Sequence, residues 1–171
     1  MQITGIHQRI IDRLLDQYRM RPDVVAITLF GSLAKGGAHP GSDIDMEVIS
    51  TAAPKWEFLK KEHDGIAVDL VFVPKAYLED LIRRYPFLCY DYISEKILYD
   101  PDVFFAKAQA EVCGYFEAHP EVADYWQENL NVMRSKKKAG THRRTDIVEA
   151  YNTAERRFSA DGRITRDFLR D

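Results

Sequence analysis

The spacing of apolar and polar positions predicts a domain of mixed helices and strands in the first hundred residues. Apolar side chains recur at helical spacing over residues 3 to 18, until a proline interrupts the pattern. Short apolar runs rich in β-branched residues at 24–30 and 66–73 predict strands that are buried on both faces. A further strand is expected at 43–49, after a glycine-rich loop at 35–42 and before a polar connection to the 66–73 strand.

The pattern becomes helical after the first hundred residues. Residues 96 to 99, followed by Asp100-Pro101, predict a short edge strand that is closed by a turn. We therefore expect an α/β domain at residues 1–100 and a helical C-terminal region at residues 101–171. The segments with a helical pattern are 75–85, 103–116, 122–133 and 146–158.

Composition is typical of a soluble globular chain. Apolar residues make up 46% of the sequence and charged residues 30%, close to the averages for such proteins. The apolar runs are far shorter than the roughly 20 residues of a membrane-spanning helix, and the N-terminal segment lacks the pattern of a signal peptide. We therefore expect a cytoplasmic protein with no membrane contact. Its two cysteines, Cys89 and Cys113, are expected to be reduced and to pack as small apolar side chains.

Three aspartates form the main candidate for chemistry. Asp43 and Asp45 are separated by one residue on a predicted strand, so both carboxylates are expected on one face. Their mutual repulsion favours a bound cation, and hard oxygen ligands suit Mg²⁺. Asp69 stands alone in the next apolar strand and adds a third carboxylate if that strand is a neighbour of the first. Three carboxylates can then hold two Mg²⁺ ions.

A phosphate site is expected beside these aspartates. Gly31-Ser32 follows a buried strand and is expected to open a helix, where backbone N–H groups and a hydroxyl can bind phosphate. The loop after it, which ends at Ser42, is rich in glycine and lets the backbone approach a ligand closely. The spacing differs from that of a Walker P-loop and from that of a dinucleotide-binding motif.

The segment LFGSLAKGGAHPGSDIDMEV closely resembles the signature of the DNA polymerase beta-like nucleotidyltransferase superfamily. In that family a Gly-Ser pair precedes Asp-x-Asp, and a third carboxylate lies on a following strand. The likeness covers about residues 24 to 101 and points to the small bacterial branch that includes minimal, aminoglycoside and lincosamide nucleotidyltransferases. It implies a nucleotidyltransferase fold, with a small mixed sheet and flanking helices, followed here by a helical unit that matches no family we can name.

The resemblance implies transfer of a nucleoside monophosphate, with ATP as the expected donor, to a hydroxyl of an unidentified small-molecule or protein acceptor. It implies that Asp43, Asp45 and Asp69 bind two Mg²⁺ ions and that Asp69 also acts as general base. The expected nucleotide-binding residues are Gly31, Ser32, Lys35 and Ser42. The alternative is a non-catalytic nucleotide-binding protein or an antitoxin-like partner with the same fold.

Other polar and aromatic residues leave alternatives open. Glu47, on the same strand face as Asp43 and Asp45, is expected to point to solvent rather than to support these aspartates, and Glu95, beside the edge strand, is a candidate for a substrate pocket. An aromatic cluster can pack in the core or stack on a base. The basic run at 134–144 holds six Lys or Arg residues and is either a solvated loop, a partner for phosphates, or a contact for nucleic acid, which the net charge of -3 does not favour. The aromatic cluster comprises Tyr85, Phe87, Tyr90 and Tyr92.

Overall fold

A computed structural model describes residues 5 to 160, so the first predicted helical residues, 3 and 4, and the end of the C-terminal region, 161–171, lie outside the described part. The strands are β1 (Val24–Phe30), β2 (Ile44–Ser50), β3 (Glu57–His63), β4 (Ile66–Pro74) and β5 (Lys96–Tyr99). The helices are α1 (Gly5–Arg19), α2 (Gly31–Ala34), α3 (Lys75–Arg84), α4 (Phe104–Ala118), α5 (Pro120–Lys138) and α6 (Arg144–Phe158), with two short 3₁₀ helices, η1 (Pro86–Leu88) and η2 (Tyr90–Ser94).

The five strands form one mixed sheet in the order β3-β4-β2-β1-β5. Strands β2 and β4 run parallel, and the other neighbouring strands are antiparallel. This arrangement confirms the predicted α/β class and the small mixed sheet with flanking helices. Strands β1 and β4 both lie inside the sheet and carry buried apolar residues on its two faces, as their sequences predicted.

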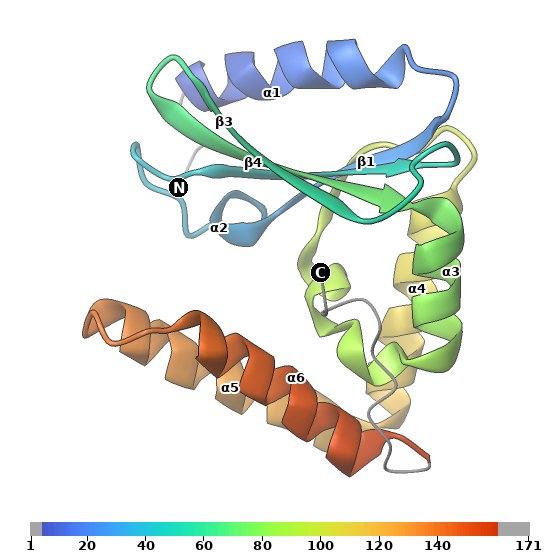
Figure 1. The fold of residues 1–171 in the computed structure, drawn as a ribbon, viewed down its shortest axis with the longest axis vertical. Helices are drawn as coiled ribbons and strands as arrows, with labels where there is room; N and C mark the ends of the chain where they lie inside the picture. The colour runs from blue at the N-terminus through green and yellow to red at the C-terminus, as the bar shows by residue number, and fades with distance from the viewer. Residues whose placement is uncertain (1–4, 161–171) are drawn as a thin grey trace.

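Each face of the sheet has its own apolar core. On one face α1 packs against alternate strand residues such as Ile27, Met46 and Leu70, which are buried together. On the other face α3 and α4 cover Ile49 and Val73, and α5 and α6 extend the same core. Figure 1 shows α1 along one side of the sheet, with α3, α4 and the α5–α6 hairpin on the other side. Within residues 5 to 160, no helix is long and apolar enough to cross a membrane.

The predicted polar connection before β4 was wrong, because residues 57 to 63 form the edge strand β3. Within residues 5 to 160 this strand pairs only with β4, and it is largely exposed, so it needs few apolar residues. A hairpin signal was present: Asp64-Gly65 joins β3 to β4, and both residues have a positive φ, 52° and 78°. Asp-Gly with this backbone is favoured in tight hairpin turns.

The predicted solvated loop at 134–144 was also wrong in its first half. Helix α5 continues through Lys138, so the first four basic residues lie on a helix and only a short connection separates it from α6. Lys136 reaches Asp146 of α6, with Nζ 2.6 Å from Oδ1. This ion pair joins the two helices near their connection.

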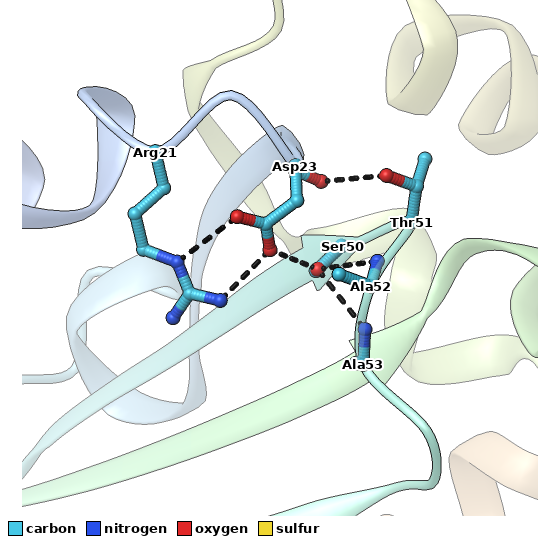
Figure 2. A network of polar contacts seen from close by, with 6 residues as sticks. All are labelled: Arg21, Asp23, Ser50, Thr51, Ala52 and Ala53. Carbon is cyan, nitrogen blue, oxygen red and sulfur yellow. Dashed lines mark hydrogen bonds and ion pairs between the residues drawn. The ribbon is translucent and has the colours of Figure 1, made fainter.

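A polar network fixes the end of the β1–β2 pair. Asp23 accepts hydrogen bonds from the guanidinium of Arg21 and, at 2.5 Å, from the hydroxyl of Ser50, and these bonds hold the pKa of Asp23 below its usual range (Figure 2). The Asp23 carbonyl also accepts the backbone N–H of Thr51 at 2.8 Å. Because this network joins the start of β1 to the end of β2, it stabilises the strand register that aligns Phe30 with Asp45 at the other end.

Candidate active site

Asp45 and Asp69 lie directly opposite each other on the parallel strands β2 and β4. Neighbouring strands are about 4.8 Å apart, so the two carboxylates occupy one small region of the sheet. Both side chains point away from α1, because Ile44 and Met46, which flank Asp45, are buried on the α1 side. Asp69 therefore lies beside the Asp-x-Asp motif. A third carboxylate at this site required β4 to be a neighbour of β2, and the sheet order meets this condition.

Asp43 lies one residue before β2, so the prediction that it begins the strand was wrong by one position. It is exposed, whereas Asp45 and Asp69 are half-buried. The alternation of a strand therefore does not fix its direction. Its charge still acts on Asp45, because it is one of the carboxylates that raise the pKa of Asp45.

The carboxylates destabilise one another when no cation is bound. Burial raises the pKa of Asp45 to about 6, and the charges of Asp69 and Asp43 add to the increase. The positive charges of Lys137 on α5 and Lys60 on β3 act in the opposite direction. Lys60 Nζ lies 3.7 Å from Asp69 Oδ1, an oxygen that is buried and has no hydrogen-bond partner.

These observations fit a magnesium site in the chemistry of its donors. Carboxylate oxygens are the ligands that Mg²⁺ prefers, and Asp69 offers a buried oxygen without a hydrogen bond. Among residues 5 to 160, no three His, Cys, Asp or Glu side chains are already gathered closely enough to enclose an ion. The paired part of the site is Asp45 with Asp69, and the exposed side chain of Asp43 would have to turn toward them.

Asp45→Asn is expected to raise the thermal stability of the metal-free protein near neutral pH. Since the folded-state pKa of Asp45 is raised, its stabilising effect is complete below the unfolded value of 3.8 and is lost as the pH rises through about 6. Asparagine removes this loss, which corresponds to about 1 to 2 kcal/mol after allowance for partial exposure, or roughly 2 to 8 °C. Thermal melts in EDTA between about pH 4 and pH 8 test this; an equal or lower melting temperature for the variant near neutral pH contradicts it.

Gly31 packs directly against Asp45. It begins α2 immediately after Phe30, which is the β1 partner of Asp45, and it has a φ of 68°. A Cβ atom at this position would collide with Oδ2 of Asp45. The glycine is therefore required twice, by the backbone conformation and by the close approach to the carboxylate. Ser32, the next residue of α2, is brought to the same end of the sheet.

Two other predicted nucleotide-binding residues have contacts within the protein. Ser42 is buried, and its hydroxyl accepts the backbone N–H of His39 at 2.9 Å, while its carbonyl accepts a hydrogen bond from His7 Nε2 at 2.8 Å. Lys35 points toward η2, where its Nζ lies 3.3 Å from Asp91 Oδ1. Ser42 thus stabilises the glycine-rich loop, and Lys35 lies beside η2. Contacts of these two residues with a nucleotide remain predictions.

Glu47 is buried, so the prediction that it points to solvent was wrong. Only 6% of its surface is exposed, and its Oε1 atom has no hydrogen-bond partner. Its β1 partner is Thr28, whose hydroxyl donates a 2.6 Å hydrogen bond to Glu95 Oε2. Burial raises the pKa of Glu47 to about 8, and burial together with the Glu47 charge raises that of Glu95.

Glu47 and Glu95 extend the acidic residues of the candidate metal site, through Asp45 and Glu47 of β2, into the interior of the protein. Glu95 is 9% exposed, so it does not lie on the surface. Gln109 of α4 donates to the carbonyls of Tyr92 and Glu95 and fixes the turn that carries the second glutamate. One sequence signal could have indicated that Glu47 is buried. It lies two residues after Asp45, on a strand whose other residues are mostly apolar.

Helix α5 directs part of the basic run toward the site. Gln127, Leu130, Arg134 and Lys137 are spaced by three or four residues and therefore lie on one face of the helix. The first three line a pocket with η2, and the charge of Lys137 lowers the pKa of Asp45. Sequence spacing alone could not show which of the clustered basic residues faces the carboxylates.

The aromatic cluster is divided between the core and the surface of this pocket. Phe87 is buried, and Tyr92 packs edge-on against Phe105 with a centroid separation of 5.9 Å. Tyr90 packs against Phe116 of α4 and also lines the pocket between η2 and α5. The core alternative therefore holds for most of the cluster, and Tyr90 alone of the four lines this pocket.

Comparison with known proteins agrees with this geometry. A family model described as a nucleotidyltransferase domain matches residues 8–99. Among curated proteins, none matches the chain significantly.

Among solved structures, the fold is similar to that of a nucleotidyltransferase-like protein from Exiguobacterium sibiricum, with a TM-score of 0.51 and 11% identity. The alignment covers 88% of this chain and 53% of that one, so the chain spans about half the length of that structure. A toxin–antitoxin structure with AMP-PNP and a mutant of the toxin–antitoxin pair MntA-HpeT each give a TM-score of 0.39, at 19% and 18% identity, and each alignment covers 74% of this chain and 98% of that one. Because the family model matches more than half of the sequence, the chain belongs to the nucleotidyltransferase domain family.

Proposed function

We propose that the chain transfers a nucleoside monophosphate, with ATP as the expected donor, to a hydroxyl of a small-molecule or protein acceptor. The observation that carries this proposal is the pairing of Asp45 with Asp69, with Gly31 packed against the first of them. The two carboxylates therefore lie beside the backbone turn at Gly31, where a side chain would prevent the close approach to Asp45. This arrangement supports binding of a triphosphate and a metal ion next to each other, beside Asp45.

The proposed reaction is a displacement at the α-phosphorus of the triphosphate. The acceptor oxygen forms a bond to the α-phosphorus while the bond from that phosphorus to the bridging oxygen breaks, and pyrophosphate leaves. Asp69 accepts the proton of the attacking hydroxyl, and the backbone N–H groups of Gly31 and Ser32 bind the leaving phosphates. Asp43, Asp45 and Asp69 would hold two Mg²⁺ ions, which when bound neutralise phosphate charge and lower the pKa of the hydroxyl.

The acceptor is expected to approach from the β4–β3 side of the sheet, where Asp69 lies. Beyond Asp69 the open edge strand β3 carries Lys60 and, two residues before it, Phe58. Phe58 is 46% exposed and lies on the same face as Asp69, since its partner Val71 is two residues further along β4. The acceptor side thus offers a cation and an apolar ring.

The first experiment is a binding titration of ATP and the other nucleoside triphosphates, with and without Mg²⁺. The double variant Asp43→Ala plus Asp45→Ala is expected to lose magnesium-dependent binding by about a hundredfold or more, since each lost charged ligand costs roughly 1.5 to 3 kcal/mol. Its matched control, Asp12→Ala plus Asp16→Ala, removes two exposed aspartates from α1 on the opposite face of the sheet. The control is expected to bind as the wild type does.

If the wild type binds nucleotide, a second experiment tests for transfer. It measures the transfer of label from α-labelled ATP to components of a cell extract, together with the release of pyrophosphate. Magnesium-dependent binding without transfer or pyrophosphate release would favour the non-catalytic alternative. Absence of nucleotide binding under every condition, or equal binding by the double variant, contradicts the proposed site.

A further inference from the structure

A small pocket lies between η2 and α5, beside the turn that follows Gly31-Ser32. Its volume is about 170 Å³. The lining residues come from three segments that are distant in sequence: Lys35, the η2 segment, and the inward face of α5. They are Lys35, Tyr90, Asp91, Ile93, Ser94, Gln127, Leu130 and Arg134.

One wall of this pocket continues into the candidate active site. The backbone N–H of Lys35, at the end of α2, donates to the carbonyl of Gly31, one helical turn away. One turn of a helix advances about 5.4 Å. Gly31 in turn packs against Asp45. The pocket therefore adjoins the carboxylates through α2.

The pocket and the acceptor side lie on opposite sides of Asp45. In the sheet order, β4 and β3 follow β2 on one side, and β1 and β5 follow it on the other. Asp69 belongs to the first side, whereas Lys35 follows β1 and η2 immediately precedes β5. A triphosphate bound at Gly31 with its α-phosphorus near Asp45 can then place its nucleoside away from the incoming hydroxyl.

The chemistry of the walls suits a flat heterocycle. The ring of Tyr90 and the side chains of Ile93 and Leu130 supply apolar surface. Gln127 is held by the hydroxyl of Tyr90, which donates to its Oε1 at 3.4 Å, and the carboxylate of Asp91 lies in the same wall. Lys35, Ser94 and Arg134 add further polar groups, so the pocket combines an apolar surface with hydrogen-bonding groups, which can orient a small ligand.

A second pocket differs in size and in its lining residues. It is larger, about 560 Å³, and lies between α3 and α4. Three basic and three acidic residues line it, together with Ile82, Phe104 and Ala108, and none of these residues belongs to α2, α5 or the strands that carry the aspartates. Its position gives it no access to the carboxylates through a shared element.

We propose that the pocket between η2 and α5 binds the nucleobase of the nucleoside triphosphate. This inference rests on the proposed function and deepens it, because it assigns the base, and with it the choice among nucleotides, to Tyr90, Gln127 and Leu130. The phosphates are bound elsewhere, by Gly31 and Ser32 and by the metal-binding aspartates.

The test compares two ligands, each with Mg²⁺: ATP, and tripolyphosphate, which has the phosphates without a nucleoside. Leu130→Trp fills the pocket and is expected to weaken ATP binding about tenfold or more while tripolyphosphate binding stays unchanged. Its matched control is Val132→Trp, on the same helix at a position that is 53% exposed and does not line the pocket. The control is expected to bind both ligands as the wild type does.

Gln127→Ala is the second variant, and because the residue is exposed this change preserves the fold. It is expected to weaken ATP binding about threefold to tenfold, the effect of losing one hydrogen bond, again with no change for tripolyphosphate. The pocket has no role in base binding if wild type binds the two ligands equally, or if both variants bind ATP as the wild type does. It also has none if the variants weaken both ligands by the same factor. Failure of the wild type to bind either ligand instead contradicts the proposed function, and the pocket assignment with it.

Discussion

Asp69→Asn is expected to lower the rate of nucleotidyl transfer by about 10² to 10⁴-fold, the usual contribution of a general base. Asparagine has nearly the same shape but cannot accept the proton of the attacking hydroxyl. The fold should be little affected, since Asp69 Oδ1 has no hydrogen bond within residues 5 to 160, and its ion pair with the exposed Lys60 is long, at 3.7 Å. The measurement is transfer of label from α-labelled ATP to the acceptor fraction of a cell extract.

Asp64→Asn provides the matched control for this prediction. Asp64 lies in the β3–β4 turn, is exposed, and has a positive φ that asparagine also tolerates. It should transfer at the wild-type rate. The proposed role of Asp69 fails if Asp69→Asn retains full transfer, and a purely structural role is indicated if its loss of activity follows a loss of melting temperature.

Gly31→Ala is expected to reduce both stability and nucleotide binding. The positive φ of Gly31 costs a residue with a side chain about 1 to 2 kcal/mol, and the added Cβ also collides with the Asp45 carboxylate. To relieve the collision, either α2 or Asp45 must move, which displaces a phosphate-binding turn or a metal ligand. A displacement of this kind costs on the order of 10²-fold in activity. Thermal melts measure the loss of stability, the ATP titration measures the loss of binding, and transfer of label from α-labelled ATP measures the loss of activity.

Gly36→Ala separates the collision from the backbone strain. Gly36 also has a positive φ, 73°, but nothing lies within 4 Å of a Cβ built on it. It should therefore show the backbone cost alone, with nucleotide binding close to that of the wild type. Equal losses of binding in both variants would mean that the contact between Gly31 and Asp45 has no part in the site.

Several features of the site could be predicted because they depend on residues close in sequence. The buried strand before Gly31, the glycine-rich loop and the order of Ser42 to Asp45 are local patterns, and the structure places each on the predicted kind of element except Asp43, which lies just before β2. The burial of Glu47 could not be inferred in the same way. It depends on α3 and α4 covering that face of the sheet, and on Thr28 and Glu95 meeting beside it.

The α/β class, the apolar strands and the identity of the candidate ligands follow from the amino-acid sequence alone, because helical and strand periodicities and turn residues act over a few neighbouring positions. The pairing of Asp69 with Asp45, the contact of Gly31 with the same carboxylate, and the effect of Lys137 rather than Lys136 on that carboxylate depend on the fold. Strand order and helix packing join residues that are far apart in the chain. Which of these residues meet depends on the burial of whole helix and sheet faces, and short sequence patterns do not contain this information.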